Sequence, residues 1–313
     1  MKIIVKIQFG SHLYGTNTEE SDLDYKGIFL PTLEQVLLGK IPKSIITKTK
    51  KGYDNKNTKD DVDTELYSLQ YFIKLACEGQ TVAIDMLHAA GDNIIDESDI
   101  WEEIIKNRHK FYTKNLQAFV GYAQKQAAKY GIKGSRLNAV SDVIKVLLQH
   151  DDDLKLKYIW EELPVGEHIK FSTSISDIRE YEVCGRKVQE TATVGYAFNV
   201  FNKYYNNYGK RAEMAARNEG IDWKAVSHAL RAAYEVKSVL AIETITFPLP
   251  EAEFLKRVKS GELDYLTLVS PILEELIEEV SILAKTSDLP EEVDKEFWDK
   301  FVVDVMKEEY NIR

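Results

Sequence analysis

The sequence predicts an α+β protein: a small mixed β-sheet with flanking helices, followed by a mainly helical region that carries a small β insertion. Three observations predict this class. Residues 2–9 form a short β-branched run that ends at a glycine. Apolar residues recur at helical spacing over residues 68–90 and again from residue 196 onward. Between these helical stretches, residues 157–194 hold β-prone runs separated by turn residues.

The composition excludes several classes of protein. With 44% hydrophobic and 11% aromatic residues over 313 positions, the chain is too apolar for a disordered protein and long enough to bury a substantial core. The formal charge of -10 argues against a general sheath for nucleic acid, because such affinity comes from Lys and Arg, although a local basic patch stays possible. Two cysteines without metal-ligand spacing, and no apolar run of about 18–20 residues, lead us to expect a soluble cytoplasmic protein.

Three segments near the N-terminus have the composition of strands and are bounded by turn residues: 2–9, 22–31 and 61–67. Residues 40–59, rich in Lys, Asn, Thr and Gly, have the composition of a turn or loop. Their lysine cluster is read as a solvated loop or hairpin tip, and the alternative is a role in attracting phosphate-bearing ligands.

Helical periodicity predicts two short helices around Gly79 and further helices over residues 101–107, 112–130, 137–150, 220–244, 269–285 and 291–310. We therefore expect a core domain at residues 1–107. A mainly helical region at 108–313, with the β insertion at about 157–194, would follow it.

Two aspartates follow the first turn, in the stretch "GSHLYGTNTEESDLD" of residues 10–24. Asp22 and Asp24 lie two apart on a predicted strand, so their side chains leave the same face. Such carboxylates repel each other, and a fold tolerates the pair when it is solvated or holds a cation. Magnesium is the natural candidate, because it prefers hard oxygen ligands and completes its shell with substrate phosphates.

The residues around this pair can supply the rest of a phosphate site. Gly10 permits close backbone approach, and Ser11 offers a hydroxyl and an N–H to phosphate oxygens. Asp63 and Glu65 share one face of the third predicted strand, so either can be a third carboxylate if the strands are neighbours. A triphosphate at the turn, bridged to two Mg²⁺ on three carboxylates, is the geometry of two-metal nucleotidyl transfer.

The chain contains five features in a fixed order: a strand, Gly-Ser, a turn, Ser-Asp-x-Asp on a second strand, and an acidic third strand. This order resembles the nucleotidyltransferases of the DNA polymerase beta superfamily, whose signature is Gly-Ser followed by Asp-x-Asp. The stretches "GQTVAIDML", "GIDWKAVSHALRAAYEV" and "FPLPEAEFLKRVKSGELD" extend the likeness over most of the chain. They are similar to predicted nucleotidyltransferases of bacteria and phages, including a group associated with RNA ligases.

The resemblance implies a role for each matching residue. Asp22 and Asp24 would bind the catalytic metals, and Gly10 and Ser11 would hold the β- and γ-phosphates beside Ser21. Asp63 is the favoured third carboxylate and metal ligand, with Glu65 as the alternative. The helical region at 108–313 would close the nucleotide cleft.

Two groups of basic residues could contact the nucleotide. The first is a helical stripe with spacing i, i+4 and i+7: Lys224, His228 and Arg231. It is either a polar face paired with acidic neighbours or a positive wall over the cleft, and the resemblance favours the second reading. The second group lies in a segment interrupted by glycines and consists of Lys129, Lys133 and Arg136. This segment is either a plain turn between helices or a loop that contacts a phosphate.

The function expected from these residues and this resemblance is a Mg²⁺-dependent nucleotidyltransferase of EC 2.7.7 type. It would move NMP from an NTP, with ATP expected, to an acceptor hydroxyl and release pyrophosphate. An RNA or tRNA end is the first choice of acceptor, a protein hydroxyl (AMPylation) the second and a small molecule the third. The alternative of another class is a catalytically silent nucleotide sensor, although a pure binder has no need for three mutually repelling carboxylates.

Overall fold

The computed structural model describes residues 1–49, 61–114, 116, 121, 134–166, 168–174 and 176–312. The chain divides into two compact units. The first comprises Met1–Ala128, Asp222–Leu263 and Pro271–Arg313; the second comprises Lys129–Ile221 and Asp264–Ser270. The first unit thus combines the N-terminal sheet with the C-terminal helices. The division into a catalytic core up to residue 107 and a region that closes the cleft stays a prediction.

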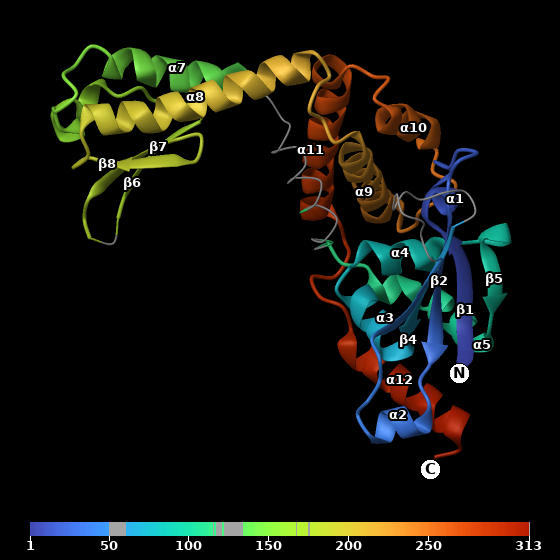
Figure 1. Cartoon of the computed structure of the whole chain (residues 1–313). Coiled ribbons are helices and arrows are strands. Elements are labelled where there is room, and N and C mark those ends of the chain that lie inside the picture. The colour runs from blue at the N-terminus through green and yellow to red at the C-terminus, as the bar shows by residue number, and fades with distance from the viewer. Residues whose placement is uncertain are drawn as a thin grey trace. The chain divides into compact units, whose positions relative to one another are not determined.

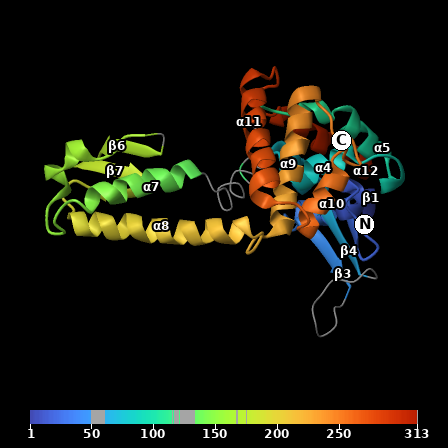
Figure 2. The same ribbon diagram turned by 90° about the horizontal axis from the view of Figure 1, so that it is seen from above.

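A mixed five-stranded sheet forms the centre of the first unit (Figure 1), and the α+β class is confirmed. Its strands are β1 (Lys2–Phe9), β2 (Leu23–Leu30), β3 (Ser44–Lys48), β4 (Val62–Ser68) and β5 (Ile94–Glu97). Their order is β3-β4-β2-β1-β5, with β2 and β4 parallel and the other neighbours antiparallel. β3 and β4 lie together at one edge (Figure 2).

The strand β3 corrects the loop predicted over residues 40–59. Ser44–Lys48 pairs antiparallel with β4, and residues 50–59 lie outside the described part of the chain. As an edge strand, β3 leaves Ile46 exposed, so it lacks the buried apolar face that usually marks a strand in sequence.

Helices complete the first unit: α1 (Gly10–Tyr14), α2 (Leu33–Leu37), α3 (Leu69–Cys77), α4 (Thr81–His88), α5 (Asp99–Lys106), α9 (Trp223–Ile242), α10 (Ala252–Ser260), α11 (Ser270–Thr286) and α12 (Lys295–Tyr310). Short 3₁₀ turns add Gly91–Asn93 and Arg108–Phe111. The predicted helix pair around Gly79 is confirmed as α3 and α4.

Aromatic and aliphatic side chains join the C-terminal helices to the sheet. α3 packs on β2 and β4, and α12 packs on α3. The ring of Phe111 stacks on that of Trp298 in α12, with ring centres 3.8 Å apart and planes inclined by 7°. Burying such aromatic area is a large apolar contribution, so α12 belongs to the same core as the sheet.

The second unit contains α7 (Gly134–Leu147), β6 (Ile169–Thr173), β7 (Arg179–Val183), β8 (Arg186–Gln189) and α8 (Val194–Ala216). Its short elements are two 3₁₀ turns, Leu156–Tyr158 and Trp160–Glu162, and a π-helical turn at Tyr265–Val269. The three strands form an antiparallel sheet, so the predicted small β insertion is confirmed. The apolar face of this sheet shares a core with α7 and α8. The helix predicted over 112–130 lies largely outside the described residues, and Tyr112–Lys114 are not helical.

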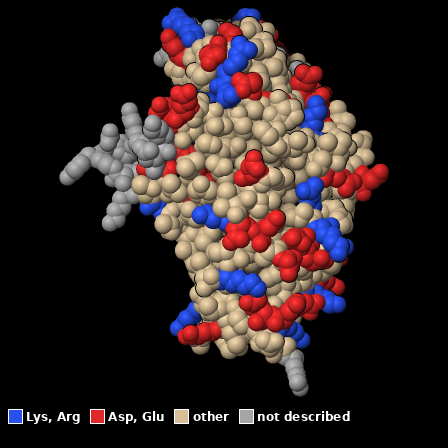
Figure 3. Space-filling model, turned by 90° about the vertical axis from the view of Figure 1, so that its right-hand side faces the viewer, with Lys and Arg blue, Asp and Glu red and all other residues tan. Residues whose placement is uncertain are grey.

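The surface follows from the composition. Asp and Glu outnumber Lys and Arg by 51 to 41 in the sequence, and acidic side chains are prominent on the face shown in Figure 3. No helix in the described part of the chain has the length and apolarity that a membrane span requires.

Candidate active site

The Gly-Ser turn packs directly against the second aspartate of the signature. Gly10 follows β1, adopts φ 65° and begins α1, so the predicted turn is one short helix. A Cβ atom placed on Gly10 would lie 2.5 Å from Oδ2 of Asp24, which is closer than a side chain permits. Only glycine therefore suits both the backbone conformation and the space at this position.

The parallel pairing of β2 with β4 brings the predicted carboxylates together. Asp24 is the register partner of Asp63 on β4, and Asp22 immediately precedes β2. Register partners on neighbouring strands point to the same side of a sheet, so Asp24 and Asp63 share a face. Burial raises the pKa of Asp24, the charges of Asp22 and Asp63 raise it further, and Lys26 opposes them. The three carboxylates are thus electrostatically coupled.

The two candidates for the third carboxylate have different partners. Oε2 of Glu65 accepts hydrogen bonds from Nζ of Lys26 at 2.7 Å and from the Tyr67 hydroxyl at 2.9 Å. Burial alone would raise the pKa of Glu65, but these hydrogen bonds outweigh it and lower the pKa. Oδ1 of Asp63, in contrast, is buried without a hydrogen-bond partner among the described residues, and its Oδ2 lies 3.9 Å from Nζ of Lys48. Asp63 therefore has a carboxylate oxygen to offer a ligand, whereas Glu65 is engaged by Lys26.

The donor set fits magnesium by chemistry. Three carboxylates, one with an orphaned buried oxygen, are the hard oxygen ligands that this ion prefers. Within the described residues, however, no three His, Cys, Asp or Glu side chains converge on one point as a metal centre. Binding would thus require Asp22, Asp24 and Asp63 to turn toward a common ion.

Two further side chains belong to this neighbourhood. Lys26 follows Asp24 by two positions and lowers its pKa. It is not among the predicted site residues, although the two-residue spacing on one strand puts it on the face of Asp24. His12, inside α1, also lowers the pKa of Asp24, and its Nε2 is buried without a partner among the described residues.

The guanidinium of Arg231 is paired with two carboxylates. Its NH1 donates to Oδ2 of Asp85 at 3.0 Å and to Oε1 of Glu235 at 2.7 Å, and its side chain is 14% exposed. These contacts balance the charge of Arg231 within a buried network and favour the other reading of the stripe, so nucleotide contact by Arg231 stays a prediction. The other reading, a polar stripe with acidic partners, describes this residue.

The remaining members of the stripe lie one and two turns earlier in α9. Burial lowers the pKa of His228 to about 4, and Arg231, Lys224 and Lys259 add to this effect, so its imidazole is neutral at neutral pH. Lys224 is exposed. Nucleotide contact by His228 or Lys224 stays a prediction.

The other predicted contacts are distributed as follows. Ser21 closes a tight turn, since its Oγ accepts the Thr18 N–H at 2.9 Å, and this turn leads into Asp22. Arg136 lies in α7 of the second unit, where its carbonyl accepts a 3.7 Å contact from Sγ of Cys184. Lys129 and Lys133 lie outside the described residues.

Of three comparisons with known proteins, the match to a family model agrees with the signature. Residues 1–152 match RlaP, described as the RNA repair pathway DNA polymerase beta family. An uncharacterized 38.9 kDa protein from the nrdC-mobD intergenic region of Enterobacteria phage T4 is 39% identical in an alignment 333 positions long, which covers 99% of this chain and 98% of the phage protein. A nucleotidyltransferase-like protein from Exiguobacterium sibiricum is 9% identical, covers 98% of this chain and 74% of its own, and superposes with a TM-score of 0.25.

The family match includes the whole signature and all five strands of the sheet, and the phage relative continues the similarity through the second unit to the C-terminal helices. The chain therefore belongs to the RNA repair pathway DNA polymerase beta family and is a nucleotidyltransferase of the DNA polymerase beta superfamily.

Proposed function

We propose that this enzyme transfers NMP from an NTP, with ATP expected, to a hydroxyl at an RNA or tRNA end, and releases pyrophosphate. The observation that carries the proposal is the register pairing of Asp24 with Asp63, against which the Gly-Ser turn packs. This arrangement supports the proposal, because the Gly-Ser turn and the carboxylates lie on adjoining elements of one unit.

In the proposed reaction the acceptor oxygen forms a bond to the α-phosphorus, and the bond from that phosphorus to the α–β bridging oxygen breaks. Pyrophosphate leaves with that electron pair, and the acceptor proton passes to a carboxylate or to solvent. Asp22, Asp24 and Asp63 would hold two Mg²⁺, which supply charge neutralisation for the attacking and leaving oxygens. Gly10 and the Ser11 hydroxyl would orient the leaving phosphates.

The family description supports an RNA acceptor, since it names an RNA repair pathway. A protein hydroxyl, a small molecule and a silent nucleotide sensor predict different results. We would incubate the protein with Mg²⁺ and each α-labelled NTP, together with RNA, with cell protein, with small-molecule extract and alone. Label in the RNA fraction supports the proposal, and label confined to another fraction names another acceptor. Nucleotide binding with label in no fraction indicates the sensor.

Carboxylate variants test the chemistry itself. Asp22→Ala and Asp24→Ala should abolish transfer while the far-UV circular dichroism spectrum is retained. Asp63→Asn should also abolish it, whereas Glu65→Gln should keep measurable transfer, because Glu65 is held by Lys26 and Tyr67. Full transfer by a folded Asp22→Ala/Asp24→Ala protein would overturn the mechanism, and the reverse result for Asp63 and Glu65 would exchange their roles.

A further inference from the structure

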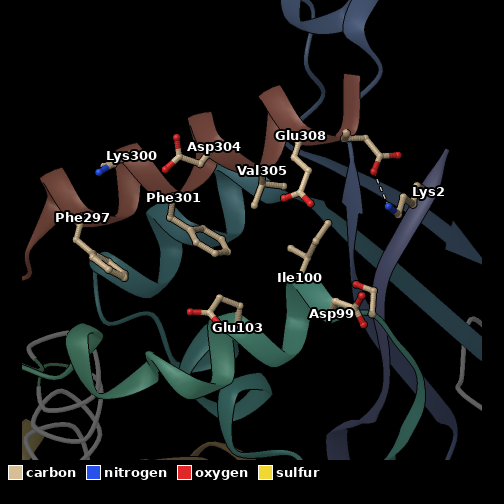
Figure 4. Close-up of a pocket in the computed structure, with 12 residues that line it drawn as sticks. Lys2, Asp99, Ile100, Glu103, Phe297, Lys300, Phe301, Asp304, Val305 and Glu308 are labelled. Carbon is tan, nitrogen blue, oxygen red and sulfur yellow. Dashed lines mark hydrogen bonds and ion pairs between the residues drawn. The ribbon is translucent and has the colours of Figure 1, made fainter. Parts of the chain in front are cut away.

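A groove lies between α5 and α12 in the first unit and has a volume of about 780 Å³ (Figure 4). α12 forms one wall, α5 forms the other, and Lys2 at the start of β1 closes one end. Nothing in the proposed transfer reaction uses this groove.

The floor of the groove is apolar along one stripe of α12. Phe297, Phe301 and Val305 follow one another at intervals of four residues, and Ile100 of α5 faces them (Figure 4). All four side chains are only half-buried. Eight residues of helix extend about 12 Å. An apolar stripe of this length on one helix, opposed by a second helix, suits the apolar face of a third helix.

The rim of the groove is acidic. Five carboxylates and two lysines line it, and one of those lysines, Lys2, is already paired with Glu309 at 2.5 Å. Asp99, Asp304 and Glu308 form no ion pair with any described residue. Phosphate-bearing ligands such as NTP or RNA are repelled by such a rim, and cationic groups are attracted.

We propose that this groove binds a basic amphipathic helix of a partner protein. Lysine or arginine side chains on such a helix would pair with Asp99, Asp304 and Glu308, while its apolar side chains would cover Phe301 and its neighbours. A polyamine would satisfy the rim and leave the apolar floor in water, and the described carboxylates do not converge as a metal centre. Charge and apolarity together therefore select an amphipathic helix.

Docking at the groove leaves the carboxylate group accessible. Lys2 lies at one end of β1 and Phe9, the register partner of Asp24, at the other. A strand of this length separates its ends by about 20 Å. The groove and the proposed nucleotide site are thus distinct, and the failure of either proposal does not touch the other.

Fluorescence anisotropy with synthetic helical peptides of about 14 residues tests the proposal. A labelled Lys/Leu amphipathic peptide should bind, and a Glu/Leu peptide and a Lys/Ser peptide should not. Asp304→Lys/Glu308→Lys should weaken binding by about tenfold or more, since two attractive contacts become repulsive. The change at Glu308 places a cation in the last turn of α12, where it favours the helix. Phe301→Ala should weaken binding without changing the net charge.

The control is Glu275→Lys/Glu278→Lys, which makes the same charge change on exposed positions of α11. It should leave binding within about twofold of the unmodified protein, and thermal melts of all variants verify folding. If the groove variant and the control variant lost affinity for the peptide equally, the effect would come from net charge alone, and the proposal would be overturned. Equal binding of the Lys/Ser peptide would also overturn it, as would complete displacement of the Lys/Leu peptide by spermidine at matched charge.

Discussion

The guanidinium carbon of Arg231 lies 3.9 Å from the centre of the Tyr14 ring. The Tyr14 hydroxyl donates to Oδ2 of Asp85 at 2.8 Å, and NH1 of Arg231 donates to the same oxygen. Tyr14 belongs to α1, the short helix that begins at the signature glycine. A buried network from α4 and α9 therefore holds the element that we assign to the triphosphate.

Replacing Arg231 by Met should strongly destabilise the protein. The variant leaves Asp85 and Glu235, both buried, without their cation. Removing one partner of a buried ion pair costs about 3–5 kcal/mol. Urea unfolding monitored by tryptophan fluorescence measures the loss. A change below about 1 kcal/mol would show that the network does not hold the fold together.

Glu235→Gln is the matched comparison on the same network and should change the free energy of unfolding by less than about 1 kcal/mol. Burial raises the pKa of Glu235 well above its usual value, and Asp85 adds to this although Arg231 opposes it. Because the site disfavours the charged form of Glu235, an uncharged amide of the same shape should be tolerated there. A loss as large as that of Arg231→Met would mean that Glu235 is ionised.

Gly10→Ala should abolish most of the transfer activity, whereas Gly39→Ala should not. Both glycines have φ near 60°, at 65° and 63°, so both variants carry the strain of a left-handed alanine, about 1 kcal/mol. Only at Gly10 would the new methyl group meet Oδ2 of Asp24, at 2.5 Å, while nothing lies within 4 Å at Gly39. Thermal melts and initial rates of both variants separate strain from displacement of Asp24. Equal activities would contradict the role of this contact.

Asp24→Asn should raise the melting temperature by about 1–3 °C in the absence of divalent ions. Burial and the charges of Asp22 and Asp63 disfavour the ionised form of Asp24, so the neutral amide relieves that cost. Adding Mg²⁺ should stabilise the unmodified protein and leave the variant unchanged, because binding to the native state raises stability. Differential scanning fluorimetry with and without Mg²⁺ measures both effects. An equal Mg²⁺ response in the two proteins would argue against Asp24 as a ligand.

His88 should make the protein less stable in mild acid. Burial lowers the pKa of His88 from 6.5 to about 4, its Nδ1 is 2.8 Å from the Ile84 carbonyl, and its Nε2 is 2.9 Å from the Tyr112 hydroxyl. Because the folded pKa lies below the unfolded value, the neutral ring contributes its stability above pH 6.5. That contribution is lost as the pH falls toward 4, with about 2 kcal/mol gone between pH 7 and pH 5.

His88→Gln is the variant that isolates this effect. It should lower the free energy of unfolding at pH 7 and flatten the dependence between pH 7 and pH 5 by about 2 kcal/mol, since other acidic groups titrate alike in both proteins. Urea unfolding at the two pH values gives the comparison. Parallel pH profiles would assign the acid sensitivity to other groups.

Local sequence was sufficient for the elements around the site. The β-branched run before Gly10 and the strand-like segment closed by Pro31 predict β1 and β2, and both strands are confirmed. The parallel pairing of β2 with β4 makes Asp63 the register partner of Asp24. The residues of these two strands do not predict it, because the pairing depends on how the chain between them crosses from one strand to the other. Asp63 and Glu65 both remain candidates for the third carboxylate, and the contact of Glu65 with Lys26 favours Asp63.

For the helical stripe on α9, the sequence predicts the helix but not the surroundings of its side chains. Its spacing was correctly predicted, and α9 extends over Trp223–Ile242. Spacing does not give direction: Arg231 points inward because Asp85, 146 residues earlier in the chain, provides a buried partner. The edge strand β3 was missed for a related reason, since its pairing with β4 and not its own apolar pattern makes it a strand.

The discontinuity of the first unit has a consequence for synthesis on the ribosome. At about 5–20 residues per second, roughly 7–30 s pass between the emergence of Asp85 and that of Arg231, which lies 146 residues later. The second unit, almost all of it within Lys129–Ile221, emerges during that interval and can complete its own core. Until the last third of the chain has been made, the sheet with its signature carboxylates lacks the C-terminal helices, and Asp85 of α4 lacks its partner Arg231.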